Sequence, residues 1–283
     1  MNIQRYIGKK ILKGQSVIIC GGSKGIGRET SKLFVQLGAN VLIIAREIAS
    51  LELIQRECES LKFSNEQSIS ILSCDCTDYK KLKPFLDDEI TKNGTPDFLI
   101  NCVGYAFPQY VEALTLQDCL NNYDVNYNGQ LVPTLIILPY FIKAKKGHIV
   151  FISSLLGLLG IMGYVAYAPS KFALVGLAES LRNELRPYDI SISILFPPDT
   201  DTPGFAEENK FKPKECEIIS QHSKLLRPEI VAEVFVKGIL KKKFMIFPGD
   251  TKLYWLIKRF FPRLIYWGID RDLHKARREL RKI

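Results

Sequence analysis

Hydrophobic positions in the first 200 residues fall into short, nearly continuous runs, separated by longer segments with helical spacing. Such runs are typical of parallel strands that are covered on both faces. Strands are predicted at 16–20, 41–45, 69–74, 98–102, 148–153 and 190–196, with a short edge strand at 244–247. Helices are predicted between them, for example at 25–37, 49–61 and 164–185. This alternation predicts an α/β fold with a Rossmann-type doubly wound parallel sheet.

The pattern changes near residue 250. We expect a single catalytic domain over 1–250, with a substrate loop at about 198–227, followed by a C-terminal segment over 251–283. Within that segment, residues 252–269 repeat apolar positions at helical spacing, and Pro262 is expected to kink or divide the helix. Lys258, Arg259 and Arg263 interrupt the apolar run, which makes it a poor transmembrane span.

Positive charge is concentrated at the C-terminal end of the chain. Residues 1–240 carry 26 basic and 26 acidic side chains, whereas residues 241–283 carry 13 and 4. A basic amphipathic helix rich in aromatic residues is typical of a membrane interface, so we expect a peripheral membrane contact. The alternative is a helix that packs on its own domain or on a second subunit. Nucleic acid is not expected as a partner, because the aromatic residues cluster with aliphatic ones instead of standing singly between cations.

The seven cysteines are scattered along the chain. Cys74 and Cys76 have no second pair at zinc-site spacing, so no metal site is predicted. We interpret the cysteines as reduced residues of a cytoplasmic protein. Residues 1–14 are polar and basic and do not resemble a secretory signal.

A glycine-rich turn follows the first predicted strand and opens the first long predicted helix. In that context the backbone approaches a pyrophosphate closely, and the helix N-terminus presents free N–H groups to the anion. We therefore predict a dinucleotide-binding turn made of Gly21, Ser23, Lys24, Gly25, Ile26 and Gly27.

Arg46, at the end of the second predicted strand, indicates which nucleotide binds. An NAD site usually places an acid there for the ribose 2′-hydroxyl, whereas a guanidinium pairs with a 2′-phosphate. NADP(H) is therefore predicted as the cofactor, and Lys24 would add a second positive charge. The alternative is that Arg46 is a solvated charge and Glu47 performs the recognition.

Tyr167 and Lys171 are four residues apart, on one face of a predicted helix. A neighbouring ammonium favours phenolate, so Lys171 is expected to lower the pKa of Tyr167. Ser154 follows the preceding strand, where its hydroxyl can meet the phenol at the carboxyl end of the sheet. A tyrosine and a lysine at this spacing are common, but their combination with Ser154 and the glycine turn is specific.

Together these motifs, with the segment from Asn101 to Gly104 and with Asn126, resemble the short-chain dehydrogenase/reductase family over roughly residues 15–205. The resemblance implies that Tyr167 is the general acid in reduction, that Lys171 binds the nicotinamide ribose, and that Ser154 stabilises the developing alkoxide. It also implies that Asn126 holds a water in a proton relay. The remaining cofactor contacts implied are Asp75, Asn101, Gly104, Pro197 and Thr202. Cys20 and the Cys102–Val103 pair depart from the usual family residues.

Residues 197–210 look similar to the matching stretch of the 3-ketodihydrosphingosine reductases within that family. This similarity implies NADPH-dependent reduction of the 3-keto group of a long-chain lipid ketone, at the cytosolic face of a membrane (the endoplasmic reticulum in a eukaryote). Acidic residues here would pair with a substrate ammonium, or else form a solvated loop or helix start: Asp199, Asp201, Glu207 and Glu208.

Two other functions stay open at this point. One is a reductase of another lipid-like ketone, such as a steroid, retinoid or acyl ketone. The other is a catalytically inactive binding protein that keeps the fold, although the tyrosine, lysine and glycines of an active enzyme are all in place. Family resemblance also implies a homo-oligomer.

Overall fold

The computed structural model, which describes residues 3–221 and 224–282, confirms the doubly wound α/β fold. Seven parallel strands form one sheet in the order β3-β2-β1-β4-β5-β6-β7. The short edge strand β7 pairs with β6, as predicted. The strands are β1 (Ser16–Cys20), β2 (Asn40–Ala45), β3 (Ile69–Ser73), β4 (Phe98–Asn101), β5 (Gly147–Ile152), β6 (Ile190–Leu195) and β7 (Met245–Ile246).

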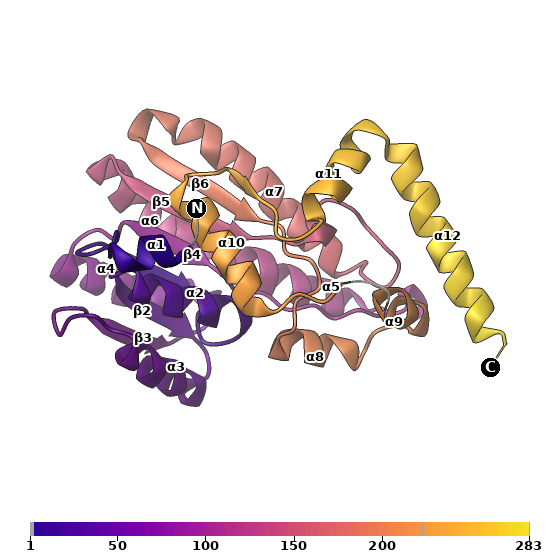
Figure 1. The fold of residues 1–283 in the computed structure, drawn as a ribbon, viewed down its shortest axis with the longest axis horizontal. Helices are drawn as coiled ribbons and strands as arrows, with labels where there is room; N and C mark the ends of the chain where they lie inside the picture. The colour runs from indigo at the N-terminus through magenta and orange to yellow at the C-terminus, as the bar shows by residue number, and fades with distance from the viewer. Residues whose placement is uncertain (1–2, 222–223, 283) are drawn as a thin grey trace.

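Helices cover both faces of the sheet (Figure 1). Helices on one face are α1 (Ile3–Gly8), α2 (Gly25–Gln36), α3 (Ile48–Ser60) and α10 (Pro228–Leu240). Those on the other are α4 (Tyr79–Asn93), α6 (Gly129–Ala144) and α7 (Tyr167–Glu184). Between β4 and β5 lie a 3₁₀ turn η1 (Val111–Ala113), α5 (Leu116–Tyr123) and a π-helical turn η2 (Asp124–Asn128), which leads into α6. Two further 3₁₀ turns, η3 (Leu155–Gly157) and η4 (Arg186–Tyr188), flank α7.

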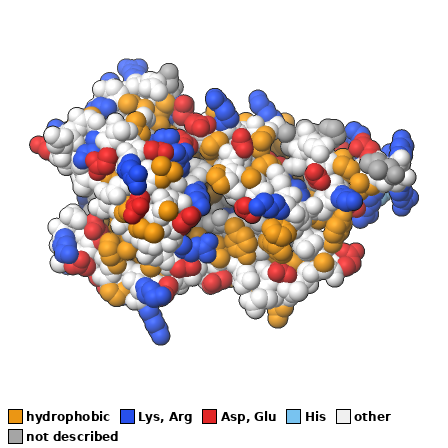
Figure 2. Space-filling view, turned by 90° about the horizontal axis from the view of Figure 1, so that it is seen from below, with side chains coloured by type: hydrophobic (Ala, Val, Ile, Leu, Met, Phe, Trp, Pro, Cys, Tyr) orange, Lys and Arg blue, Asp and Glu red, His pale blue; other side chains and the backbone are white. Residues whose placement is uncertain are grey.

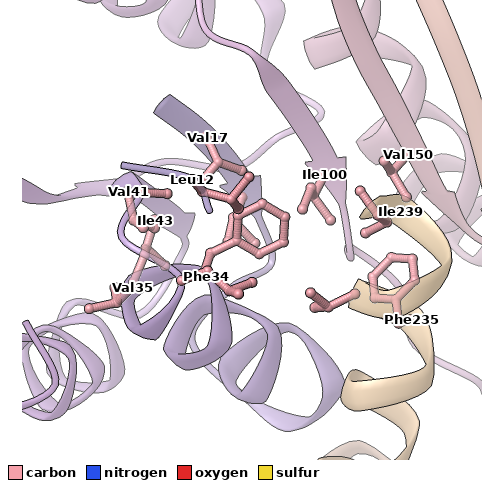
Figure 3. Packing of buried hydrophobic residues seen from close by; sticks show 14 of the residues in the cluster. Leu12, Val17, Phe34, Val35, Val41, Ile43, Ile100, Val150, Phe235 and Ile239 are labelled. Atoms are coloured by element: carbon pink, nitrogen blue, oxygen red, sulfur yellow. The ribbon is translucent and has the colours of Figure 1, made fainter. Parts of the chain in front are cut away.

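Strand β1 explains why the hydrophobic runs are continuous. Val17 and Ile19 face the cluster that α2 and α10 complete, whereas Ile18 and Cys20 face the opposite cluster. Successive strand residues point to opposite faces, so a strand buried on both sides must be apolar at every position. Figure 3 shows the first cluster, in which Phe34 of α2 lies among side chains of the central strands.

The predicted substrate loop contains two helices in the part that the structure describes. They are α8 (Pro203–Asn209) and α9 (Lys214–Gln221). Thr202 caps α8 by accepting a hydrogen bond from the Phe205 N–H, at 3.1 Å, and Pro203 occupies the first helical position. Residues 222 and 223 of this loop lie outside the described residues.

The C-terminal segment forms a helical hairpin that projects from the body of the molecule (Figure 1). It consists of α11 (Thr251–Phe260) and α12 (Pro262–Leu280), so Pro262 divides the predicted helix. Trp255 on α11 packs against Phe247, with ring centroids 5.5 Å apart, and α12 packs against α9. Among the described residues, none of the helices is both long and apolar enough to cross a membrane.

Candidate active site

The glycine turn between β1 and α2 is closely packed main chain. Gly21 and Gly25 have positive φ angles of 74° and 54°, which favour glycine. A Cβ on Gly27 would collide with the carbonyl oxygen of Gly21, and one on Gly21 would lie 2.8 Å from the main chain of Cys102. Lys24 precedes α2 without capping it through its side chain, so the first N–H groups of the helix keep their capacity to bind an anion. Ser23 lies in the turn, and Ile26 packs against the core from the first turn of α2.

Arg46 lies at the carboxyl end of β2 beside a pocket of about 400 Å³. Asp75 also lines this pocket, with a carboxylate oxygen 3.9 Å from the Arg46 guanidinium. The Arg46 side chain is 72% exposed. Glu47, by contrast, forms an ion pair with Lys24 and accepts a hydrogen bond from Ser50 at 2.8 Å, and the Lys24 ion pair lowers its pKa.

Tyr167 begins α7, and Ser154 follows β5, so both reach the carboxyl edge of the sheet. The Ser154 hydroxyl lies close enough to the Tyr167 phenol to lower its pKa. The Ser154 oxygen also accepts the Leu156 N–H at 3.1 Å. The predicted approach of these two hydroxyls is therefore present in the structure.

The prediction for the Tyr167 pKa was wrong in direction. Burial raises the pKa of this phenol well above its usual range, and the carboxylates of Glu208 and Asp199 raise it further, whereas the Ser154 hydroxyl lowers it. Burial also lowers the pKa of Lys171 to about 7, which weakens the lysine as a source of positive charge. The spacing of the two residues gave no information about burial, and burial dominates here.

Lys171, Asn126 and Gly104 meet directly beneath this edge. A Cβ on Gly104 would lie 2.8 Å from the Lys171 Nζ and 2.9 Å from the Asn126 Oδ1, so any larger residue would displace these two side chains. The Lys171 Nζ donates to the Ile152 carbonyl at 3.2 Å and lies 5.6 Å from the centre of the Tyr167 ring. Asn126, in the π-helical turn, accepts the Tyr105 N–H and donates to the Tyr105 carbonyl, both at 2.9 Å.

Asn101 is placed differently from the other cofactor candidates. The Asn101 side-chain nitrogen donates to the Thr134 hydroxyl at 3.1 Å inside the fold. The side-chain oxygen of Asn101 is buried without a hydrogen-bond partner among the described residues. A contact between Asn101 and a cofactor would therefore come from its main chain. Pro197 and Thr202 do approach the site, because the Pro197 carbonyl accepts the Leu155 N–H and the Thr202 methyl packs at Gly25.

Three side chains complete the other side of Tyr167, and of these only Glu208 was singled out from the sequence, as one of four acids that would pair with a substrate ammonium. The Tyr164 hydroxyl donates to Glu208 at 2.6 Å, and the Tyr164 ring packs edge-on against Tyr167 at 6.0 Å. Lys212 pairs with the same carboxylate at 3.3 Å. Glu208 and Lys212 are four residues apart, a spacing that indicates an ion pair within a helix. Helix α8 ends between them, so this rule does not explain their contact.

These features fit a dinucleotide. The glycine turn leaves a cradle that a Cβ would fill, helix α2 presents its N-terminus there, and the pocket beside Arg46 follows at the end of β2. A dinucleotide lying across the carboxyl ends of β1 and β4 would extend from that pocket towards Tyr167 and Lys171. The described residues contain no group of three or more side chains placed to hold a metal ion.

The chain belongs to the short chain dehydrogenase family, whose profile matches residues 15–213. It is therefore an oxidoreductase with a nicotinamide cofactor. Curated relatives carry a more specific name. A 3-dehydrosphinganine reductase of Danio rerio is 38% identical over 234 residues, covering 82% of this chain and 70% of that protein. A 3-ketodihydrosphingosine reductase of Dictyostelium discoideum is 40% identical over 257 residues, covering 86% and 77%.

Solved structures show the same fold. The LigD apo form from Sphingobium sp. strain SYK-6 superposes with a TM-score of 0.74 at 25% identity, covering 90% of this chain and 97% of that one. A 3-oxoacyl-[acyl-carrier protein] reductase with bound NAD from Brucella melitensis has a TM-score of 0.72 at 23% identity, covering 87% and 94%.

Proposed function

We propose that this enzyme uses NADPH to reduce the 3-keto group of 3-ketodihydrosphingosine, which gives dihydrosphingosine. The observation that carries the reaction type is that Tyr167, Ser154 and Lys171 come together at the carboxyl edge of the sheet, with the Lys171 Nζ 5.6 Å from the centre of the Tyr167 ring. The observation that favours this ketone is that relatives at 38% and 40% identity are named for its reduction.

The choice of NADPH rests on the charges beside β2. Glu47, the acid that would otherwise bind a ribose 2′-hydroxyl, is engaged with Lys24. Arg46 is exposed at the mouth of the adjoining pocket, where a guanidinium pairs well with a 2′-phosphate. Asp75, at 3.9 Å, is too far from Arg46 to form a strong hydrogen bond with it, so the guanidinium remains available.

The protein's part in the reaction follows from the state of the phenol. A bound nicotinamide cofactor supplies the hydride. Tyr167 stays protonated at neutral pH because burial raises its pKa, so it can donate its proton to the carbonyl oxygen. Ser154 donates a hydrogen bond to the same oxygen as negative charge develops on it. Lys171 would hold the cofactor at its ribose, and the two hydrogen bonds between Asn126 and Tyr105 keep the π-helical turn in place.

The test is turnover by the purified chain in mild detergent, followed by loss of NADPH absorbance with 3-ketodihydrosphingosine. Turnover that prefers NADPH to NADH and is lost in Tyr167→Phe supports the whole proposal. If NADPH binds, as followed by its fluorescence, but this ketone is not reduced, the substrate assignment fails and steroid, retinoid and acyl ketones are tested next. If the chain reduces none of them, the inactive binding protein becomes the better reading.

We also propose that the α11–α12 hairpin contacts an anionic membrane surface. One face of the hairpin packs on the body through Trp255, Ile265 and Ala276. Away from these contacts, the hairpin exposes large apolar side chains: Leu253, Tyr254, Phe260, Phe261, Leu264, Tyr266 and Trp267. Figure 2 shows Lys and Arg side chains gathered at the end of the molecule where Figure 1 places α12. Exposed aromatic residues beside cations suit a bilayer interface.

The hairpin packs on its own domain and still exposes apolar and basic side chains. Packing on the domain and contact with a membrane are therefore compatible. Flotation with phosphatidylserine-containing vesicles is the direct test. Binding that needs the anionic lipid supports a membrane surface, whereas equal recovery with and without vesicles contradicts it. A homo-oligomer stays a prediction, which sedimentation of the purified chain would test.

A further inference from the structure

The four acidic residues after β6 occupy two different environments. Asp201 and Glu207 are exposed, and Glu207 pairs with Lys210 at 2.6 Å on the surface of α8. Asp199 and Glu208 are only partly exposed, and the negative charge of each raises the pKa of the Tyr167 phenol. Of the four candidates for an ammonium site, Asp199 and Glu208 are therefore the two whose charge reaches the proton donor.

Glu208 has one carboxylate oxygen in use and one free. Its Oε1 accepts the Tyr164 hydroxyl and pairs with the Lys212 Nζ. Its Oε2 accepts no hydrogen bond from any residue that the structure describes, although the side chain is only 15% exposed. Because the Tyr164 ring packs against Tyr167, only the Tyr164 side chain stands between the Glu208 carboxylate and the proton donor.

Lys212 shows that the surroundings of Glu208 accept an ammonium group. Its side chain is 2% exposed, and its Nζ lies 4.3 Å from the centre of the Phe205 ring as well as against the carboxylate. A carboxylate and an aromatic face are the two features that bind ammonium ions in proteins.

Charge in this region is unbalanced. Asp199 accepts a hydrogen bond from Ser220 at 2.7 Å but forms no ion pair within the described residues. The ammonium of Lys212 therefore contacts Glu208 directly and reaches Asp199 through the Ser220 hydroxyl, to which it donates at 3.4 Å. Burying a carboxylate without a counter-charge is costly, so a second cation at this point would be stabilising. Burial does raise the pKa of Glu208, and Lys212 opposes only part of that effect.

We propose that Glu208, supported by the charge of Asp199, binds the ammonium group of the substrate and makes the enzyme specific for α-amino ketones. This inference rests on the proposed function. In 3-ketodihydrosphingosine the amino nitrogen is two bonds from the carbonyl carbon. A carbonyl oxygen at the Tyr167 phenol therefore places the ammonium close to the phenol, and Tyr164 with Glu208 forms the wall on that side.

The test compares two substrates in two variants. The substrates are 3-ketodihydrosphingosine and its desamino analogue, which keeps the ketone, the hydroxyl and the chain. Glu208→Gln keeps the shape and can still accept the Tyr164 hydrogen bond, but it carries no charge. Glu207→Gln makes the same change at the exposed neighbour and serves as the matched control.

We expect wild type and Glu207→Gln to prefer the amino ketone by about tenfold or more in kcat/KM, as a charge-assisted contact implies. In Glu208→Gln the preference collapses, mainly through a higher KM for the amino ketone, while the desamino rate changes by less than about threefold. An equal loss on both substrates would overturn the inference, because Glu208 would then act only by holding Tyr164 and Lys212.

A binding measurement separates this inference from the proposed function. Dihydrosphingosine and the matching diol without the amino group are titrated into wild type and Glu208→Gln in the presence of NADP⁺. Amine binding that is at least tenfold tighter than diol binding and depends on Glu208 supports ammonium recognition even if the ketone is not turned over. Equal amine binding by wild type and Glu208→Gln rejects it, whatever the activity.

Discussion

The two sides of the candidate active site are built from different parts of the chain. On the cofactor side, the main chain of the turn between β1 and α2 forms the cradle. The glycines of this turn are Gly21, Gly25 and Gly27. On the substrate side, side chains form the wall, and Tyr164 reaches Glu208 across 44 positions. A binding site formed by the main chain requires residues without side chains, such as glycine. A binding site formed by side chains requires that each one has the right charge and length. The two sides should therefore respond to mutation in different ways.

The largest expected effect concerns Tyr167, where the two sides meet. Tyr167→Phe removes the proton donor and should lower kcat by about 10²–10⁴-fold, with NADPH affinity unchanged. Tyr164→Phe deletes a hydroxyl one turn earlier and should cost much less, because that hydroxyl contacts Glu208 and not the carbonyl oxygen. Single-turnover rates measure both. Similar losses in the two variants would contradict the assignment of Tyr167 as the donor.

The next effect tests the cofactor side. Gly27→Ala brings a Cβ against the Gly21 carbonyl, and the turn must shift, so NADPH affinity should fall at least about tenfold. Gly176→Ala is the matched control, because a Cβ there meets nothing within 4 Å and α7 should be slightly stabilised. Fluorescence titration of NADPH gives both affinities, and circular dichroism reports whether each variant is folded. Unchanged NADPH binding by folded Gly27→Ala would argue against the turn as the cradle.

On the cofactor side, the charge that should distinguish NADPH from NADH is that of Arg46. Arg46→Ala removes the proposed partner of the 2′-phosphate, so NADPH should bind about tenfold more weakly while NADH affinity stays the same. Arg56→Ala, on the exposed face of α3, removes the same charge and should change neither affinity. Calorimetric titration with each cofactor measures the ratio. Equal weakening of NADPH and NADH would mean that Arg46 does not distinguish them.

The hairpin extends the comparison to a third surface. Replacing Phe260 and Phe261 by serine removes two exposed aromatic rings, and binding to anionic vesicles should weaken by about tenfold. In the control variant, serine replaces Leu116 and Leu120. These two leucines are also largely exposed, but they lie on α5. NADPH affinity should stay the same in both variants. Equal vesicle binding by the hairpin variant and wild type would remove the support for a membrane surface.

The smallest effect concerns His148, near the start of β5 in the sheet that carries both sides of the site. It is buried against Ser193 at 2.8 Å, and burial lowers its pKa from 6.5 to about 3. The unfolded chain therefore binds more protons between these values, so stability is fully present above pH 6.5 and is lost as the pH falls towards 3. His148→Gln should reduce that loss by about 1 kcal/mol between pH 6.5 and 5.5, as measured by urea unfolding. An identical pH slope in both proteins would show that His148 is not the source.

The sequence predicted the fold well because strands such as β1 bury both faces and leave a continuous apolar run. It also predicted that Tyr167 and Ser154 would meet at the carboxyl edge of the sheet, since parallel strands end at one edge. It failed where burial or long-range contacts decide. Burial reversed the direction expected for the Tyr167 pKa, and the contact between Tyr164 and Glu208 joins residues too distant in the sequence for any local pattern to indicate.

The packing of α12 on α9 has a consequence for the order in which the chain is made. The Glu215 carboxylate of α9 lies 3.6 Å from the Arg277 Nε of α12 and also accepts a hydrogen bond from the Tyr110 hydroxyl. Helix α12 therefore supports the substrate side through α9. All seven strands and the glycine turn precede residue 250. During synthesis, the cofactor side can therefore fold as a unit before α12 leaves the ribosome, whereas the substrate side gains its support from α12 only afterwards.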